Sequence, residues 1–179
     1  MCDSDDLNLN CTGHEEMSQL QMPWHRHSRR SHGRAKRAVC ELRVDGTVPG
    51  TLGLIKLKAC GGRGSEGRRT LEVRYHIAPG PLAPDTLHGF HIHETADFST
   101  GCASAGGHYN PFDSNHGNSQ DQPRHVGDFG NIRADSSGLA EGMITAPVAL
   151  DSVIGRAFVL HLGEDDLGQG GDAGSRTTG

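Results

Sequence analysis

Long hydrophobic runs and aromatic side chains are both scarce in this sequence of 179 residues. It holds five phenylalanines, two tyrosines and one tryptophan. No stretch approaches the roughly 18 consecutive apolar residues of a transmembrane helix, so we expect no membrane span. The first residues, MCDSDDLNLN, are acidic and polar, and they lack the basic start and apolar segment of a signal peptide.

Glycine and histidine are abundant instead. The 26 glycines and a hydrophobic content of 34% favour short strands joined by turns over a large helical core. The 12 histidines exceed an ordinary share, and imidazole is the commonest metal ligand in proteins. The formal net charge is -5, and we expect no specific nucleic-acid partner. The composition therefore favours a β-rich protein with the means to bind metal ions.

The composition changes sharply near residue 37. Residues 25–37 read HRHSRRSHGRAKR, with three histidines, six basic residues and no large apolar side chain. Such a run buries too little surface to offset the entropy lost on ordering, so we expect a disordered leader over 1–37 and one domain over 38–179. The basic run is either a solvated tail or a polyanion contact. Its end, RAKR (34–37), also resembles a site for secretory-pathway convertases.

Beyond the leader the apolar pattern has a period of two, which is typical of strands with one buried face. Apolar and polar side chains alternate over residues 38–44, 71–77 and 90–93. His76 falls on a polar face, where we expect it to be solvated. Turn residues separate these segments, which favours an antiparallel β-sandwich or barrel. We also predict a strand over 153–160 and one helical turn near 164–167.

Two histidines near the middle of the chain can present ligands side by side. His91 and His93 are two residues apart on a strand, so both rings leave one face while Phe90 and Ile92 enter the core. A second group lies in the polar segment 106–131, which has almost no apolar anchor. Its members are His108, His116, His125 and Asp128. A bound ion would hold such a loop, and three imidazoles with one carboxylate form a tetrahedral zinc set.

Five motifs, taken together, resemble one known family in order and spacing. They are GFHIHE (89–94), GCASAGGHYNP (101–111), RHVGDFGN (124–131), IGRAFVLH (154–161) and DDLGQGG (165–171). With AVCELRVDG (38–46), which resembles the family's first strand, they are similar to the copper/zinc superoxide dismutases over residues 38–179. The resemblance implies an all-β fold, a Greek-key antiparallel barrel or sandwich, that carries one copper and one zinc ion.

The resemblance also implies roles for single residues. The copper ligands would be His91, His93, His108 and His161. The zinc ligands would be His108, His116, His125 and Asp128. His108 would bridge the two ions and serve catalysis by taking up and returning a proton, while superoxide is converted to dioxygen and hydrogen peroxide. Asp165 matches an outer carboxylate that joins a copper ligand to a zinc ligand, and His88 matches a structural position.

The sequence departs from the family after residue 171. The family continues to an arginine beside the copper, a cysteine and a last apolar strand, whereas this chain stops at Gly179. Counted from His161 without a gap, Arg176 falls too early to match that arginine. We therefore expect reduced activity, strand edges left unpaired by the missing last strand, and a homodimer that is in doubt.

The cysteines leave their pairing open. Cys102 matches a family disulfide cysteine whose partner belongs to the absent C-terminal part. It either stays free or pairs with Cys60, Cys2 or Cys11. Cys40 lies on the inward face of its predicted strand, where we expect a buried thiol.

Two other functions stay open beside a superoxide dismutase. The domain could bind copper and zinc with little or no turnover, as a metal store or an extracellular scaffold. Alternatively, residues 25–37 could tether it to sulfated glycans or acidic lipids. The convertase-like site and the wording GEDD (163–166), which resembles extracellular members, favour secretion. The lack of a signal peptide favours the cytoplasm.

Overall fold

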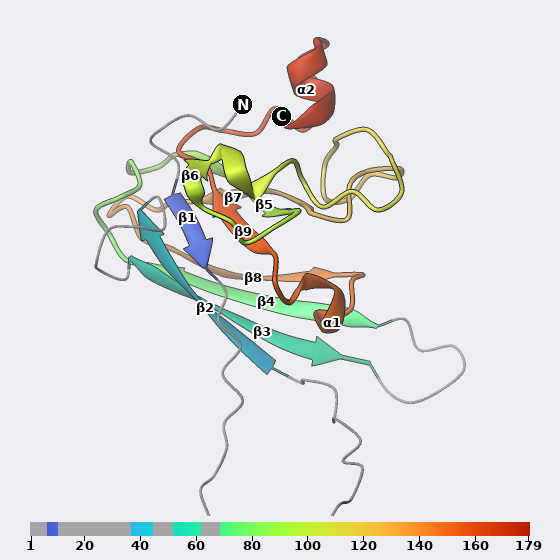
Figure 1. Ribbon diagram of the computed structural model, residues 1–179. Helices are drawn as coiled ribbons and strands as arrows, with labels where there is room; N and C mark the ends of the chain where they lie inside the picture. The colour runs from blue at the N-terminus through green and yellow to red at the C-terminus, as the bar shows by residue number, and fades with distance from the viewer. Residues whose placement is uncertain (1–6, 11–36, 45–51, 62–68) are drawn as a thin grey trace, which may run out of the picture.

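The computed structural model describes residues 7–10, 37–44, 52–61 and 69–179 (Figure 1). The strands are β1 (Leu7–Asn10), β2 (Arg37–Val44), β3 (Gly53–Cys60), β4 (Thr70–Ile77), β5 (Leu87–His93), β6 (Ser99–Cys102), β7 (Asp128–Arg133), β8 (Ala140–Ala146) and β9 (Ala157–Leu160). The short helical segments are η1 (Ala103–Ala105), α1 (Leu150–Val153) and α2 (Ala173–Thr177). The predicted polyanion segment lies outside the described residues except for Arg37.

Eight of the strands form one antiparallel sheet. Their order is β7-β5-β9-β1-β2-β3-β4-β8. Strand β3 shows why the sequence folds this way, since Gly53, Ile55 and Leu57 are buried whereas Lys56 and Lys58 are exposed. The all-β antiparallel architecture confirms the predicted fold class. Within the described part of the chain, β7 and β8 are the two edges of this sheet.

The few aromatic side chains concentrate behind the strands that bear the histidines. Phe90 on β5, Phe129 on β7 and Phe158 on β9 are buried, and their ring centroids lie 5.7 to 6.0 Å apart. Such aromatic pairs stabilise a core by about 0.5–1.5 kcal/mol each beyond their burial. Because side chains alternate along β5, a rigid core on the Phe90 side fixes the neighbouring histidines on the other side.

Strand β1 lies in the stretch that was expected to be a disordered leader. It pairs antiparallel with β2 on one side and with β9 on the other. Its sequence, LNLN, alternates apolar and polar residues, a pattern too short to stand out beside so many polar neighbours. Residues 7–10 therefore form a strand within the predicted leader, and the rest of that leader lies outside the described residues except for Arg37. Strands β2 and β9 both pair with β1, whereas the described sheet still has the two edges β7 and β8.

Two local predictions near the last strand are wrong. The pattern predicts a strand over 153–160, but β9 begins only at Ala157, and α1 ends at Val153. Gly155 has a φ of 82°, a left-handed conformation that interrupts extended backbone. The helical turn predicted near 164–167 is also absent, because these residues form a loop that precedes α2.

The described cysteines are in different states. Cys40 is buried and disulfide-bonded, so the prediction of a buried thiol is wrong. The inward face of β2 predicts the burial of this sulfur, but burial alone does not distinguish a thiol from a disulfide. Cys60, at the end of β3, is free. The side chain of Cys102 lies outside the described part, so its pairing stays a prediction.

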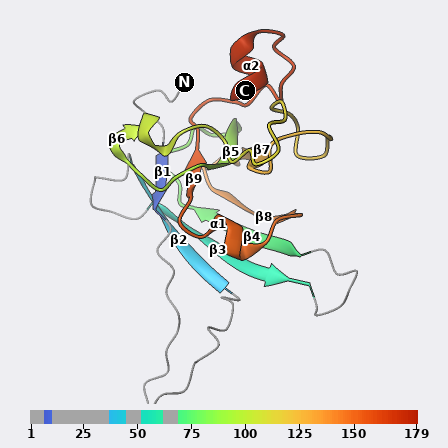
Figure 2. The same cartoon turned by 45° about the vertical axis from the view of Figure 1, so that its right-hand side comes forward.

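The part of the polar segment that precedes β7, residues 106–127, lies next to α2 beyond one end of the strands, as both views show (Figure 2). The backbone N–H of His116 donates to the carbonyl of Arg176 at 2.8 Å, which ties the two together. Asp172 caps α2 by accepting from Ser175 N at 2.9 Å. No helix among the described residues is long and apolar enough to cross a membrane.

Candidate metal centre

Strands β5 and β9 position three of the predicted histidines. His91 and His93 alternate with Phe90 and Ile92 on β5, and β5 pairs antiparallel with β9. His161 follows directly after the last residue of β9, and its N–H donates to the carbonyl of Gly89 at 2.8 Å. Two neighbouring strands therefore present these rings at one place, although some seventy residues separate them in the sequence.

His108 joins the same place through the polar segment. It forms an isolated antiparallel bridge with His93, and the next residue, Tyr109, donates its N–H to the carbonyl of Ile92 at 2.7 Å. Gly127 lies against this contact, where an added Cβ would stand 2.3 Å from Ile92 O. Glycine is required at this position because the loop backbone approaches the strand too closely for a side chain.

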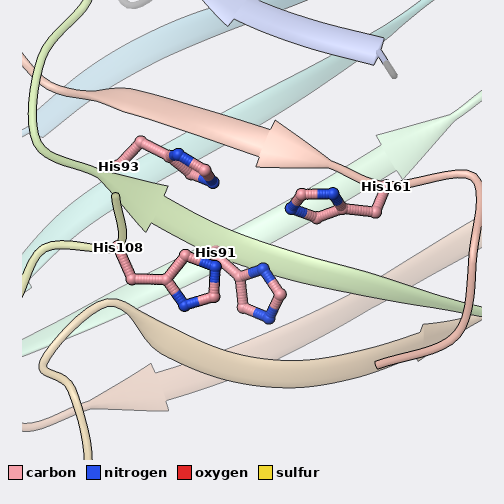
Figure 3. A group of neighbouring side chains, drawn as sticks. All are labelled: His91, His93, His108 and His161. Atoms are coloured by element: carbon pink, nitrogen blue, oxygen red, sulfur yellow. The ribbon is translucent and has the colours of Figure 1, made fainter. Parts of the chain in front are cut away.

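Four histidines form what we call the strand group: His91, His93, His108 and His161. One ring nitrogen of each lies within 4.8 Å of those of the others. The ring centroids of His91 and His108 are 4.0 Å apart, and those of His91 and His161 are 5.0 Å apart. Figure 3 shows the four rings gathered around one space beside β5. This is the spacing that a single metal ion needs.

A second set, which we call the loop group, shares one member with the first: His108, His116, His125 and Asp128. Its rings surround a single carboxylate oxygen, Asp128 Oδ1, which lies 2.8 Å from His108 Nδ1, 3.0 Å from His116 Nδ1 and 3.2 Å from His125 Nδ1. All four side chains are buried. Three nitrogens and one oxygen converge as the ligands of a tetrahedral ion would.

Several ring nitrogens that face these two spaces lack ordinary partners. Among the described residues, His91 Nδ1 and His108 Nε2 are buried without a hydrogen bond. His116 Nδ1 and His125 Nδ1 both lie beside the one oxygen Asp128 Oδ1, at 3.0 and 3.2 Å. An unsatisfied buried polar atom costs about 1–3 kcal/mol, so several together indicate a missing partner. A metal ion in each space would satisfy them. Imidazoles suit copper, and three imidazoles with a carboxylate suit zinc, so the residues fit both ions.

Asp165 links the two groups from behind. Its Oδ2 lies 2.8 Å from His91 Nε2, and its Oδ1 lies 2.8 Å from His116 Nε2. A carboxylate accepts hydrogen bonds, so it holds the proton of each ring on Nε2 and leaves Nδ1 as the ligand atom. The predicted outer carboxylate is therefore placed where it can orient one ring of each group.

The sequence interpretation missed Asn131, which fixes Asp165. Its Nδ2 donates to the carbonyl of Asp165 at 2.8 Å, and its Oδ1 accepts from the Asp165 N–H at 2.9 Å. This pair of hydrogen bonds fastens the loop after β9 to β7. Asn131 is the last residue of the motif RHVGDFGN, but the sequence does not reveal its role because its partner lies 34 residues away.

Backbone carbonyls orient two of the other rings. His93 Nδ1 lies 2.9 Å from Gly106 O, and His125 Nε2 lies 3.0 Å from Ser114 O. Each contact requires a proton on that nitrogen and leaves the opposite nitrogen as the ligand atom. His88 is buried but turns elsewhere: its Nδ1 donates to His161 O at 3.1 Å. It thus supports the backbone of the strand group without belonging to it.

Burial keeps two members of the strand group neutral, whereas carboxylates favour the charged form of His116. Burial, followed by repulsion from His108, lowers the pKa of His91 to about 3, and burial lowers the pKa of His108 to about 4. Burial also lowers the pKa of His116, but Asp128 and Asp165 outweigh it and raise the pKa to about 9. His91 and His108 are therefore neutral at pH 7, which is the form that binds metals.

Two arginines near the site have different surroundings. Arg124, which the sequence interpretation did not single out, is buried and donates to the carbonyls of Ser119 (3.0 Å) and His125 (2.6 Å), so it braces the loop group. Arg176 is exposed on α2, and its Nη2 donates to the carbonyl of Gly171 at 3.1 Å. This contact holds the guanidinium against its own loop.

Comparisons with known proteins agree with this geometry. The family model for copper/zinc superoxide dismutase matches residues 53–179. A Cu-Zn superoxide dismutase of Yarrowia lipolytica is 42% identical over 147 residues, which is 80% of this chain and 89% of that protein. One from Humicola lutea is 46% identical over 154 residues, 80% of this chain and 90% of that protein.

A third relative, from Candida glabrata, is also named a Cu-Zn superoxide dismutase. It is 49% identical over 111 residues, which is 60% of this chain and 71% of that protein. The match of the family model covers most of the chain, including every member of the strand and loop groups. With two donor sets that share one histidine and relatives of this similarity, the chain belongs to the copper/zinc superoxide dismutase family.

Proposed function

We propose that this protein is a superoxide dismutase that converts superoxide to dioxygen and hydrogen peroxide at a copper site joined to zinc by His108. The observation that carries the proposal is the position of His108 in both donor groups. Its Nδ1 faces Asp128 at 2.8 Å, whereas its Nε2 faces the strand group. One imidazole can thus serve two ions at once.

The strand group is the proposed copper site and the loop group the proposed zinc site. The strand group consists only of imidazoles, which suit copper in both oxidation states. The loop group adds one carboxylate, Asp128, and its four buried side chains leave no open position, as in structural zinc sites. Copper, when bound, would supply the one-electron redox couple that superoxide disproportionation needs.

The protein side chains supply position and a proton. His108 Nε2 is the atom that can hold a proton near the substrate, while its Nδ1 keeps the ring anchored toward Asp128. Asp165 and the carbonyl of Gly106 keep His91 and His93 in fixed orientations. A ring held in this way returns to the same place after each proton transfer.

A second candidate function is metal binding with little or no turnover. The observation that favours it is the hydrogen bond between Arg176 and Gly171 O, which holds the guanidinium in its own loop. A site without a fixed cation attracts an anionic substrate less strongly. The two candidates predict the same metal content and different rates, so the rate distinguishes them.

The test uses the full chain loaded with copper and zinc. Superoxide decay is followed by pulse radiolysis for the unchanged chain, for His91→Ala and for His76→Ala. His76 is an exposed histidine on β4 that faces Glu141, so its variant is the matched control. We expect His91→Ala to lose the acceleration and His76→Ala to keep it. Equal decay in the unchanged chain and in His91→Ala overturns the proposed function.

Assembly and compartment stay predictions. A homodimer predicts twice the chain mass in sedimentation equilibrium. A polyanion contact through residues 25–37 rests on the six basic residues of that segment and predicts salt-sensitive heparin binding that is lost when the segment is deleted. The prediction of secretion is based on the sequence motifs RAKR (34–37) and GEDD (163–166). It is tested by looking for the protein in the culture medium of cells that express it.

A further inference from the structure

Strand β1 connects two parts of the sheet. In the strand order, β7, β5 and β9 lie on one side of β1, and β2, β3, β4 and β8 lie on the other. Figure 1 shows this short strand between β2 and β9. The first part includes β5, which bears His91 and His93, and β9, which leads into His161. Residues from the beginning of the chain therefore adjoin the strands of the metal centre.

The register brings β1 next to His161. Leu7 pairs with Leu160, the residue directly before this histidine. The N–H of His161 itself donates to Gly89 O, on the β5 side. Because successive residues of a strand direct their backbone groups to opposite sides, the N–H and C=O of Leu160 face β1. Strands β1 and β5 thus hold the end of β9 from both sides.

Strand β9 depends on this support because it is short and fully buried. Its four residues are all buried, and its neighbours in the sheet are β5 and β1. Without β1 it would be an edge strand with unpaired backbone groups. The loop group depends on β9 less directly. Asp128 begins β7 at the far edge of the sheet, and His116 and His125 lie in the polar segment. Asp165, which orients His116 from the loop after β9, is itself fastened to Asn131 on β7.

We propose that residues 7–10 are a positioning element of the copper centre: by pairing with β9, this N-terminal strand holds His161 in the strand group. The inference rests on the proposed copper ligands and extends the metal-binding domain beyond 38–179. The position between β2 and β9 accepts an extended segment of this chain through main-chain hydrogen bonds, as in strand addition. Such a segment can be removed and returned as a peptide.

The test compares the full chain with a chain that lacks residues 1–10. Copper and zinc affinities are measured by competition with chelators. We expect copper affinity to fall by about 10–100-fold, the range for losing a group that orients a ligand, and zinc affinity to change little. A peptide of residues 4–10 should restore copper affinity. The same peptide with Leu9→Pro should not, because proline lacks the N–H donor.

Unchanged copper affinity in the shortened chain, or an equal loss of both metals, overturns the proposal. Hydrogen exchange on the unmodified full chain gives a measurement that needs no variant to fold. Amides of 7–10 and 157–160 should show similar, strong protection, and rapid exchange at 7–10 beside slow exchange at 157–160 also overturns it. None of these measurements uses superoxide turnover, so an inactive chain tests this proposal separately from the proposed function.

Discussion

Asp165→Asn is the substitution that tests the link between the two donor groups most directly. The carboxylate accepts from two rings, with Oδ2 at 2.8 Å from His91 Nε2 and Oδ1 at 2.8 Å from His116 Nε2. Oδ1 also accepts from the Leu167 N–H at 2.7 Å. An amide of the same shape has one oxygen and one NH₂ group, so it can accept from only one of the two rings.

The magnitude follows from the bond that is lost. A hydrogen bond to a charged group is worth about 1.5–3 kcal/mol, which corresponds to about 10–100-fold in metal affinity. His91 lies within a paired strand, whereas His116 lies in a polar loop with few apolar contacts. The ring of His116 therefore depends more on Asp165 for its orientation. We expect zinc affinity to fall by about 10–100-fold and copper affinity to fall less.

Chelator competition on the full chain measures both affinities. Asp166→Asn, at an exposed neighbour whose Oδ1 accepts from Gly168 N and Ser175 Oγ, is the matched control and should leave zinc affinity unchanged. Unchanged zinc affinity in Asp165→Asn would show that the carboxylate does not orient His116. A larger fall in copper affinity than in zinc affinity would show that pairing within the sheet does not hold the ring of His91 in place without Asp165.

Three further predictions concern the pH, the core and the support of His161. Because the pKa of His116 is raised to about 9, its ring is protonated at pH 7, and zinc binding must displace that proton. Zinc affinity should therefore rise with pH up to about 9, and calorimetry in two buffers should detect the released proton. Phe90→Ala should lower the free energy of unfolding by about 3–5 kcal/mol in urea, and a loss below 1 kcal/mol would contradict its place in the core. His88→Ala should cost about 1–3 kcal/mol and should weaken copper binding more than zinc binding in the same competition assay.

Much of the metal centre is readable in the sequence because its signals are local. Two residues separate His91 and His93, and the alternation with Phe90 and Ile92 already predicts which side each ring takes. The polar segment with His108 and Asp128 lacks apolar anchors, which predicts an ion as its support. The period of two likewise predicts β2 and β4, and the structure confirms both strands.

The other features depend on contacts between distant parts of the chain. In the sequence, nothing distinguishes Asn131 from other polar residues. Its role follows from its hydrogen bonds to Asp165, which lies 34 residues further along the chain. The state of Cys40 and the first residue of the strand predicted over 153–160 were both predicted wrongly. Burial does not distinguish a disulfide from a thiol, and a pattern of apolar residues does not reveal the left-handed Gly155 that delays the start of β9 to Ala157.

The sequence by itself predicted the strand class, the pair His91 and His93, and the members of the loop group, because periodicity and ligand spacing act over a few residues. The placement of His108 and His161 in the strand group was implied only by the resemblance to the family. Only the tertiary structure decided that His161 meets His91, that Asp165 reaches one ring of each group, and that residues 7–10 lie between β2 and β9. A four-residue strand has little preference of its own, and it acquires its position from the main-chain groups that two neighbouring strands present.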